Sequence, residues 1–206
     1  MGKAPKVAST RPEARRVDAL GRTRVNHIGS LTVHDVKSLS TFQRILAIDP
    51  TTSGFAFIVL EGGERLVDWG VARVWAESEN EYLARIEAIV QRYSPSWLVV
   101  ENAMQSRRGT RARRRIALLL RYAKSQKMIA TTVSWEAVRQ ALGQAVNTKY
   151  EIASTIANRF PELAIHLPKR RRAWESEDPR MNIFDATAIA LAAWVSPGSD
   201  LPLSIR

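Results

Sequence analysis

The segment 44–62, RILAIDPTTSGFAFIVLEG, constrains the fold most, because two apolar runs in it flank a short polar turn. Apolar runs of this length, bounded by Pro, Gly and small polar residues, are typical of buried strands joined as a hairpin. A third run, RLVDWGVARVW, follows the Gly62-Gly63 pair. We therefore predict three successive antiparallel strands. The first of them ends at an acidic residue, Asp49.

The rest of the chain alternates between helical and strand patterns. Ser134 is placed to cap one helix and Asn147 to cap the next, while Asp178 followed by Pro179 is typical of the start of a third. The predicted elements are helices over 79–93, 110–129, 135–143, 148–160 and from near 178 through the stretch IFDATAIALAAW, with strands at 97–100 and 130–134. Three antiparallel strands followed by alternating helices and strands predict an α/β domain, a mixed sheet flanked by helices.

The length of 206 residues suits one core and a tail. Residues 1–40 are basic, have few large apolar side chains and show no sustained period. We predict a disordered N-terminal arm over 1–40, followed by the folded domain at 41–200. Such an arm either contacts a polyanion or is an extension without a role, and the sequence leaves both open.

Charge and composition narrow the class of partner. The chain has 31 Lys and Arg against 20 Asp and Glu, a net charge of +11. Such an excess indicates nucleic acid or an anionic membrane as partner, and nucleic acid is favoured because no apolar run approaches the roughly 18 residues of a membrane span. The chain has no cysteine, which excludes disulfides and thiolate metal sites within it and fits a cytoplasmic location.

Three acidic residues stand in unusual positions. Asp49 ends the first predicted strand, Glu101 ends the fourth, and Asp185 lies inside an alanine-rich apolar helix. If the first and fourth strands are parallel neighbours, their ends meet about 5 Å apart at one edge of the sheet. Clustered carboxylates repel one another unless a cation lies among them, and all-oxygen ligands select Mg²⁺ or Mn²⁺. Two such ions about 4 Å apart would suit phosphodiester cleavage.

Each acid also has a plainer interpretation. Asp49 before a proline is typical of a turn, and Glu101 could begin a polar loop. Asp185 could be a helix residue paired with Arg180. The combination is what indicates a metal site.

Two basic clusters are candidate DNA contacts. No acidic residue occurs between Glu101 and Glu136, and the basic residues in that interval are Arg107, Arg108, Arg111, Arg113, Arg114, Arg115, Arg121, Lys124 and Lys127. This run follows the predicted metal-binding strand and is placed to bind phosphates, although a charge run is often only a solvated face.

The second cluster consists of Lys169, Arg170, Arg171 and Arg172, with Trp174 close behind. Guanidinium groups beside an indole suit phosphate contact together with stacking on an unpaired base. The alternative is that Trp174 packs on the core, as most tryptophans do.

The motifs together resemble a known family. IDPTTSGFAFIV resembles the first strand motif of the RuvC Holliday junction resolvases, LVVENAM their second acidic motif, and FDATAIALA their final helix with the last catalytic Asp. VRQALGQAVNTKYEIASTI is similar to the segment of that family that carries a Lys ahead of a helix. The resemblance covers residues 45–195 in the family's order.

The resemblance implies an RNase H-like fold with a five-stranded mixed sheet of three antiparallel and two parallel strands. It implies a Mg²⁺-dependent crossover junction endodeoxyribonuclease of DNA recombination and repair, a homodimer that places paired nicks in four-way junctions, nucleoid-associated if bacterial. Asp49, Glu101 and Asp185 match the metal ligands of the family. Lys149 and Arg139 match basic positions that contact the scissile region, so Lys149 would stabilise the phosphate in the transition state.

This sequence departs from the family pattern at two places. The fourth acidic position, three residues before Asp185, is Asn182, a weaker neutral ligand. Asp178, seven residues before Asp185, could substitute from the same helix face if the helix extends that far, or it could be the helix N-cap. Met104 and Gln105 stand where the family has an aromatic residue, so base stacking at the junction centre would be done differently or by another residue.

The sequence also suggests a dimer face and two alternative functions. The apolar side of the predicted 110–129 helix, with Ile116, Leu119 and Leu120, is our predicted dimer face. A non-catalytic nucleic-acid-binding module of the same fold is the main alternative, and Asn182 is the feature that favours it. A sugar-kinase-like ATPase, suggested by IDPTTSG, is disfavoured because 206 residues do not supply its two domains.

Overall fold

The structure is a computed structural model that describes residues 43–74, 78–104, 109–143, 148–172 and 174–195. Its centre is a five-stranded sheet with the order β3-β2-β1-β4-β5. The strands are β1 (Arg44–Thr51), β2 (Gly54–Glu61), β3 (Arg65–Arg73), β4 (Trp97–Glu101) and β5 (Ile129–Val133). β2 pairs antiparallel with β1 and β3, whereas β4 pairs parallel with β1 and β5. The predicted mixed sheet is therefore confirmed, including the parallel pairing of β1 with β4.

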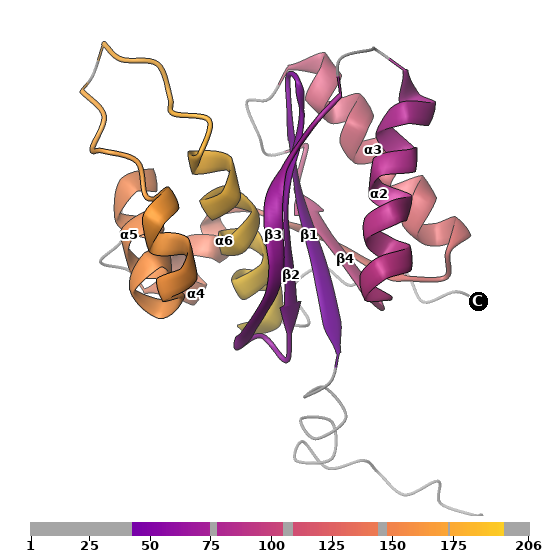
Figure 1. Ribbon diagram of the computed structural model, residues 1–206, viewed down its shortest axis with the longest axis horizontal. Coiled ribbons are helices and arrows are strands. Elements are labelled where there is room, and N and C mark those ends of the chain that lie inside the picture. The colour runs from indigo at the N-terminus through magenta and orange to yellow at the C-terminus, as the bar shows by residue number, and fades with distance from the viewer. Residues whose placement is uncertain (1–42, 75–77, 105–108, 144–147, 173, 196–206) are drawn as a thin grey trace, which may run out of the picture. The chain divides into compact units, whose positions relative to one another are not determined.

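Helices cover both faces of this sheet (Figure 1). One face carries α2 (Glu79–Tyr93) and α3 (Thr110–Ser125), and each face has its own apolar core. The other face carries α4 (Trp135–Leu142), α5 (Lys149–Arg159), a short 3₁₀ helix (Pro161–His166) and α6 (Met181–Val195). Within the described residues, we find no helix with the length and apolar character needed to cross a membrane.

The alternation of side chains along β1 and β4 determines the face of the sheet to which each side chain points. Ala47 of β1 and Val99 of β4 lie in the core beneath α4, α5 and α6, whereas Ile48 lies in the core beneath α2 and α3. Successive side chains of a strand point to opposite faces. Asp49 and Glu101, each two residues further along, therefore belong to the α6 face at the carboxyl ends of their strands.

The turn between β1 and β2 is held from the opposite face by Arg115 of α3. One guanidinium nitrogen donates to the carbonyl of Thr51 and, at 3.1 Å, to the carbonyl of Gly54. The Arg115 side chain also lies over the Tyr82 ring, with Cζ 4.7 Å from the ring centroid. Arg115 is only 8% exposed. The expectation that it contacts phosphate with its basic neighbours is therefore wrong, because it serves the fold instead.

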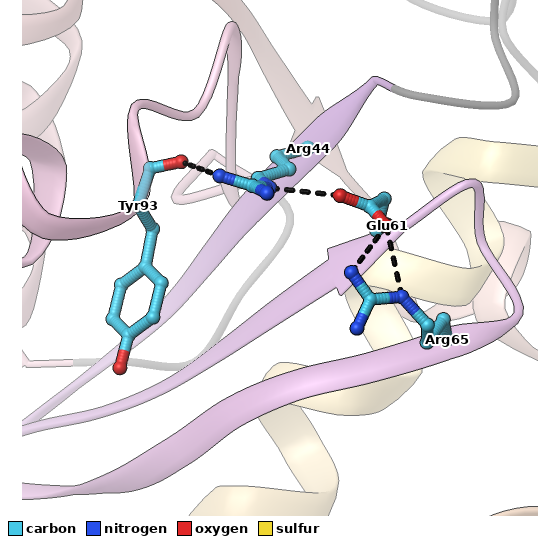
Figure 2. A network of polar contacts seen from close by, with 4 residues as sticks. All are labelled: Arg44, Glu61, Arg65 and Tyr93. Carbon is cyan, nitrogen blue, oxygen red and sulfur yellow. Dashed lines mark hydrogen bonds and ion pairs between the residues drawn. The ribbon is translucent and has the colours of Figure 1, made fainter.

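The opposite end of β1 is fixed by a cluster of paired charges (Figure 2). Arg44 donates from Nε to Oε1 of Glu61 and from its terminal nitrogen to the carbonyl of Tyr93, both at 2.9 Å. Arg65 donates from Nε to Oε2 of Glu61 at 2.8 Å. These contacts tie the start of β1 to the end of β2, the start of β3 and the end of α2.

Several predicted boundaries are shifted. The helix predicted over 110–129 ends at Ser125, and the strand that follows begins at Ile129. The cap of α5 is Thr148, whose side chain accepts from the Glu151 N–H while the Glu151 carboxylate accepts from the Thr148 N–H. Asn147, the predicted cap, lies outside the described residues. The last helix begins at Met181, three residues later than Asp178.

The predicted dimer face on α3 is wrong. Ile116 and Leu119 are buried in the core between α3 and the sheet, and Leu120 packs against the same core. An amphipathic helix shows the same apolar stripe whether it covers its own sheet or a second subunit. Here the stripe is used inside the domain, so these residues are not available to a partner.

Candidate active site

Asp49 and Glu101 are neighbours at the carboxyl edge of the sheet. The parallel register of β1 and β4 pairs Ile48 with Val100, so the next residue of each strand is one of the two acids. Both carboxylates lie on the α6 face and are almost fully buried, at 1% and 3% exposure. A buried acidic side chain is costly to the folded state unless a polar or cationic group compensates it. Their location therefore points to a role beyond packing.

Asp185 approaches the same edge from α6, which packs on β1, β2 and β4. The helix is buried along nearly its whole length, and many of its residues are alanine, whose small side chain lets a helix lie close to a sheet. Asp185 is 3% exposed. Its Oδ2 accepts a hydrogen bond from Nζ of Lys149 at 2.8 Å. The pairing of Asp185 with Arg180, the plainer interpretation, is not observed, because Arg180 pairs with Asp178 at 2.7 Å.

Lys149 is the first residue of α5, and its ammonium links two acids. It donates to Oδ2 of Asp185 and to Oε1 of Glu177, both at 2.8 Å. Burial alone would lower the pKa of Lys149, but the charges of Asp185 and Glu177 and the hydrogen bonds to them outweigh burial and raise its pKa. A cation at a helix N-terminus opposes the helix dipole. The two carboxylates offset this cost and keep the ammonium charged.

Trp135, the first residue of α4, was missed by sequence reasoning. Its indole Nε1 donates to Oε1 of Glu101 at 2.9 Å. The ammonium of Lys149 lies 5.5 Å from the centroid of the Trp135 ring, a cation–π distance. Glu101, Trp135, Lys149 and Asp185 therefore form a continuous chain of contacts. The only signal in the sequence was an aromatic residue directly after a helix cap, which does not reveal its partners.

Asp178 and Asn182 occupy different positions from those expected. α6 begins at Met181, so Asp178 lies before the helix. The premise that Asp178 and Asp185 share a helix face is therefore wrong. Hydrogen bonds from the Arg180 side chain and backbone lower the pKa of Asp178. Asn182 lies in the first turn of α6, half-buried. Glu177, which the sequence did not single out, is the acid that shares Lys149 with Asp185.

The donor set fits a hard divalent ion in its chemistry. Asp49, Glu101 and Asp185 supply carboxylate oxygens on one face and at one edge of the sheet, and such ligands suit Mg²⁺ or Mn²⁺. In the conformation described, however, no group of three acidic, histidine or cysteine side chains among the described residues is arranged to hold an ion. Asp185 is engaged by Lys149 instead. Ion binding at this edge therefore requires these side chains to rearrange.

The first basic cluster lies partly on α3. Arg111, Arg113 and Arg114 are exposed, and Arg111 and Arg114 line a cleft of about 310 Å³ together with the start of α2. Arg107 and Arg108 lie outside the described residues. Arg139, on α4, forms an ion pair with Glu136 of its own helix at 2.6 Å.

The second cluster borders a larger cleft of about 930 Å³. Lys169, Arg170 and Arg171 line it, and so does Lys149, which connects it to Asp185. Trp174 is exposed beside this segment, and Cζ of Arg172 lies 5.7 Å from its ring centroid. The alternative that Trp174 packs on the core is therefore wrong.

Solved structures resemble this chain, and two of them are RuvC structures. One is RuvC from T. thermophilus in complex with a Holliday junction substrate, which is 20% identical, with a TM-score of 0.54, over 75% of this chain and 95% of that one. The other is a Thermus thermophilus RuvC structure, 21% identical with a TM-score of 0.54, over 75% of this chain and 96% of that one. No family model matches the sequence, and a search of curated proteins finds no match. The chain therefore has the RuvC-like form of the RNase H-like fold, as its sequence motifs predicted.

Proposed function

We propose that this protein is a Mg²⁺-dependent endonuclease that resolves four-way DNA junctions by paired nicks. The observation that supports the proposal most is the pair of buried acids Asp49 and Glu101 on neighbouring strand ends of a RuvC-like sheet. Asp185, also buried, is linked to Glu101 through the contacts of Lys149 and Trp135. The neighbouring RuvC structure holds a Holliday junction substrate, which supports branched DNA as the substrate class. The net charge of +11 supports a polyanionic substrate as well.

The carboxylates of Asp49, Glu101 and Asp185 would hold the divalent ions, with the amide of Asn182 as a further, neutral ligand. When bound, such ions activate a water molecule and stabilise the charge that develops on the phosphate. Trp135 would hold Glu101 in orientation through its indole N–H. Lys149 would present its ammonium to the negative charge of the scissile phosphate after releasing Asp185.

We further propose a two-fold dimer. A four-way junction has approximate two-fold symmetry, so two identical sites would reach opposed strands. Because the apolar stripe of α3 is buried within the domain, the subunit contact must use another surface.

A second candidate is a non-catalytic module that binds branched DNA. One observation favours it: the neutral side chain of Asn182 stands at the family's fourth acidic position. A module of this kind would bind junctions without cutting them.

Cleavage of synthetic DNA separates the two candidates. We expect purified protein to nick four-way junctions in Mg²⁺ or Mn²⁺, in symmetric pairs, and to cut linear duplex of the same sequence far more slowly. EDTA should abolish the reaction without abolishing binding. Tight junction binding with no nicking in either metal would establish the non-catalytic module instead.

A further inference from the structure

The segment between α5 and α6 builds a cleft beside the proposed active site. In Figure 1 this orange segment projects beyond the ends of both helices. The cleft, about 930 Å³, is lined by the start of α5 and by residues of the 168–181 segment. Lys149 lines it and also donates to Asp185, so the cleft borders one of the three proposed ligands.

Each acidic residue that lines this cleft has a hydrogen-bond or ion-pair partner. Glu175 accepts from the backbone N–H of Arg172 at 2.8 Å. Glu177 pairs with Lys149 and Asp178 pairs with Arg180. Two of the three carboxylates, those of Glu177 and Asp178, are therefore paired with a cation.

Its basic residues, in contrast, are available. Lys169, Arg170 and Arg171 are exposed, and no ion pair or hydrogen bond of their side chains occurs within the described part of the chain. Three consecutive exposed cations suit successive phosphates of a nucleic-acid backbone. They alone would not distinguish a single strand from a duplex.

Trp174 supplies that distinction. It is 79% exposed, which leaves a large aromatic surface in water, and its ring is contacted by the Arg172 guanidinium. An exposed indole beside cations suits stacking with a nucleobase, because every base has a flat π-face and its phosphate is attracted to the cations. Bases of an intact duplex have their faces covered by neighbours, so only an unpaired base can stack in this way.

We propose that this cleft and the exposed Trp174 ring beside it together bind an unpaired nucleotide next to the cut, with its base on Trp174 and its phosphates on Lys169, Arg170 and Arg171. The inference rests on the proposed function for the position of the cut, but binding of an unpaired nucleotide is testable without cleavage. It assigns the base-stacking role to the segment before α6. Met104, which stands where the RuvC family has an aromatic residue, is exposed but offers no aromatic ring.

A cycle that combines protein variants with an abasic substrate tests the stacking contact. All proteins carry Asp49→Asn so that binding is measured without cleavage, and Ca²⁺ is present throughout. Junctions are compared that contain either a normal nucleotide or an abasic site at each position flanking the cut. Trp174→Ala should weaken binding of the normal junction about 5-fold to 100-fold, and Trp174→Phe much less.

At one position, removal of the base should weaken binding to the Trp174 protein but should not weaken binding to Trp174→Ala any further. Met104→Ala is the control, and its binding should respond to the abasic site as the Trp174 protein does. Equal sensitivity of Trp174→Ala and the Trp174 protein to the abasic site at every position would overturn the proposal. The proposal would also be overturned if Met104→Ala, and not Trp174→Ala, removed the sensitivity of binding to the abasic site. Because Trp174 is exposed, the variants should unfold at the same temperature, and the cycle then reports on binding alone.

The phosphate contacts have a separate readout. Replacing Lys169, Arg170 and Arg171 together by Gln should weaken binding and reduce the slope of log affinity against log salt by about 2, since each phosphate contact on a single strand contributes about 0.7. An unchanged slope would remove these three residues from the site.

Discussion

The two ends of β1 place charged residues in opposite ways. At its start, Arg44, Glu61 and Arg65 pair positive with negative near the surface, and the cluster joins three strands and a helix. At its end, Asp49 is buried beside Glu101, a residue of the same charge on the neighbouring strand. The first arrangement compensates its own charges. The second gathers negative charge, which suits a site that receives a cation and a phosphate.

If the proposed function is right, β1 contributes to stability at one end and to chemistry at the other. Changes at the start of β1 should alter the stability of the fold and leave the cleavage rate intact. Changes at its end should alter the cleavage rate and leave stability largely intact.

The largest effect on cleavage is expected at the acidic end of β1, the end where Asp49 lies beside Glu101. Asp49→Asn or Glu101→Gln should reduce the rate of junction cleavage by at least about 1000-fold, because several kcal/mol of transition-state stabilisation depend on the ions that these carboxylates would hold. Junction affinity in Ca²⁺ should stay within a few-fold. Single-turnover cleavage assays and binding titrations measure the two quantities.

Asp68→Asn is the matched control, since Asp68 lies on β3 of the same sheet and accepts a hydrogen bond from Tyr93. It should cleave at the normal rate. If Asp49→Asn retained Mg²⁺-dependent nicking, the acidic end would lose its proposed role.

The next effect concerns Arg115, which supports the acidic end from the other face of the sheet. Arg115→Met should lower the free energy of unfolding by about 2–3 kcal/mol, because the carbonyls of Thr51 and Gly54 would lose a charged donor. Denaturant unfolding measures this change. The exposed neighbour Arg114→Met should change it little. Equal stability of the Arg115 and Arg114 variants would show that the buried guanidinium does not hold the turn.

A smaller, more specific effect is expected at Trp135. Trp135→Phe keeps the ring beside Lys149 but removes the N–H that orients Glu101, so the Mg²⁺ concentration for half-maximal cleavage should rise about 10-fold. The rate at saturating Mg²⁺ should change much less.

Trp97→Phe provides the comparison, because the Trp97 indole donates to the neutral hydroxyl of Thr131 on the same sheet face. It should lose some stability while its Mg²⁺ requirement stays the same. A common shift in both variants would mean that the effect of Trp135 is general packing rather than orientation of Glu101.

The smallest effect belongs to the paired end of β1. Hydrogen bonds from Arg65 and Arg44 lower the pKa of Glu61 in the folded protein. A carboxyl with a lowered pKa adds stability above its unfolded pKa and loses that contribution as the pH falls through the folded value. Glu61→Gln should therefore lower the melting temperature slightly at pH 7.

The difference from the unchanged protein should shrink as the pH falls below about 4.3, where an ordinary Glu becomes protonated. Cleavage at pH 7 should be unaffected. Loss of cleavage in Glu61→Gln would contradict the separation of the two ends.

The strands and the three acids could be predicted from the sequence because their signals are local. A buried apolar run that ends in Asp49 or Glu101 is recognisable from a few residues. The parallel register of β1 and β4 then places the two acids side by side. Trp135 and Glu177 could not be predicted in this way. Their partners, Glu101 and Lys149, lie far away in the sequence, and only the fold brings each pair together.

The wrong predictions on α3 have a related cause. Arg115 lies in a run of arginines, and composition does not reveal which of them turns inward to the carbonyls of Thr51 and Gly54. Likewise, the apolar stripe with Ile116 and Leu119 has the same sequence pattern whether the helix packs on its own sheet or on a second subunit. In both cases the answer depends on tertiary contacts rather than on periodicity.

Locating bound Mn²⁺ by anomalous diffraction tests the central claim most directly. Crystals of the protein soaked in Mn²⁺ should show an anomalous peak in contact with the carboxylates of Asp49, Glu101 and Asp185, with Lys149 released from Asp185, and Asp49→Asn crystals should lack it. Mn²⁺ bound elsewhere, or an Asp185 still held by Lys149 with no ion beside it in a protein that nicks junctions, would contradict the account.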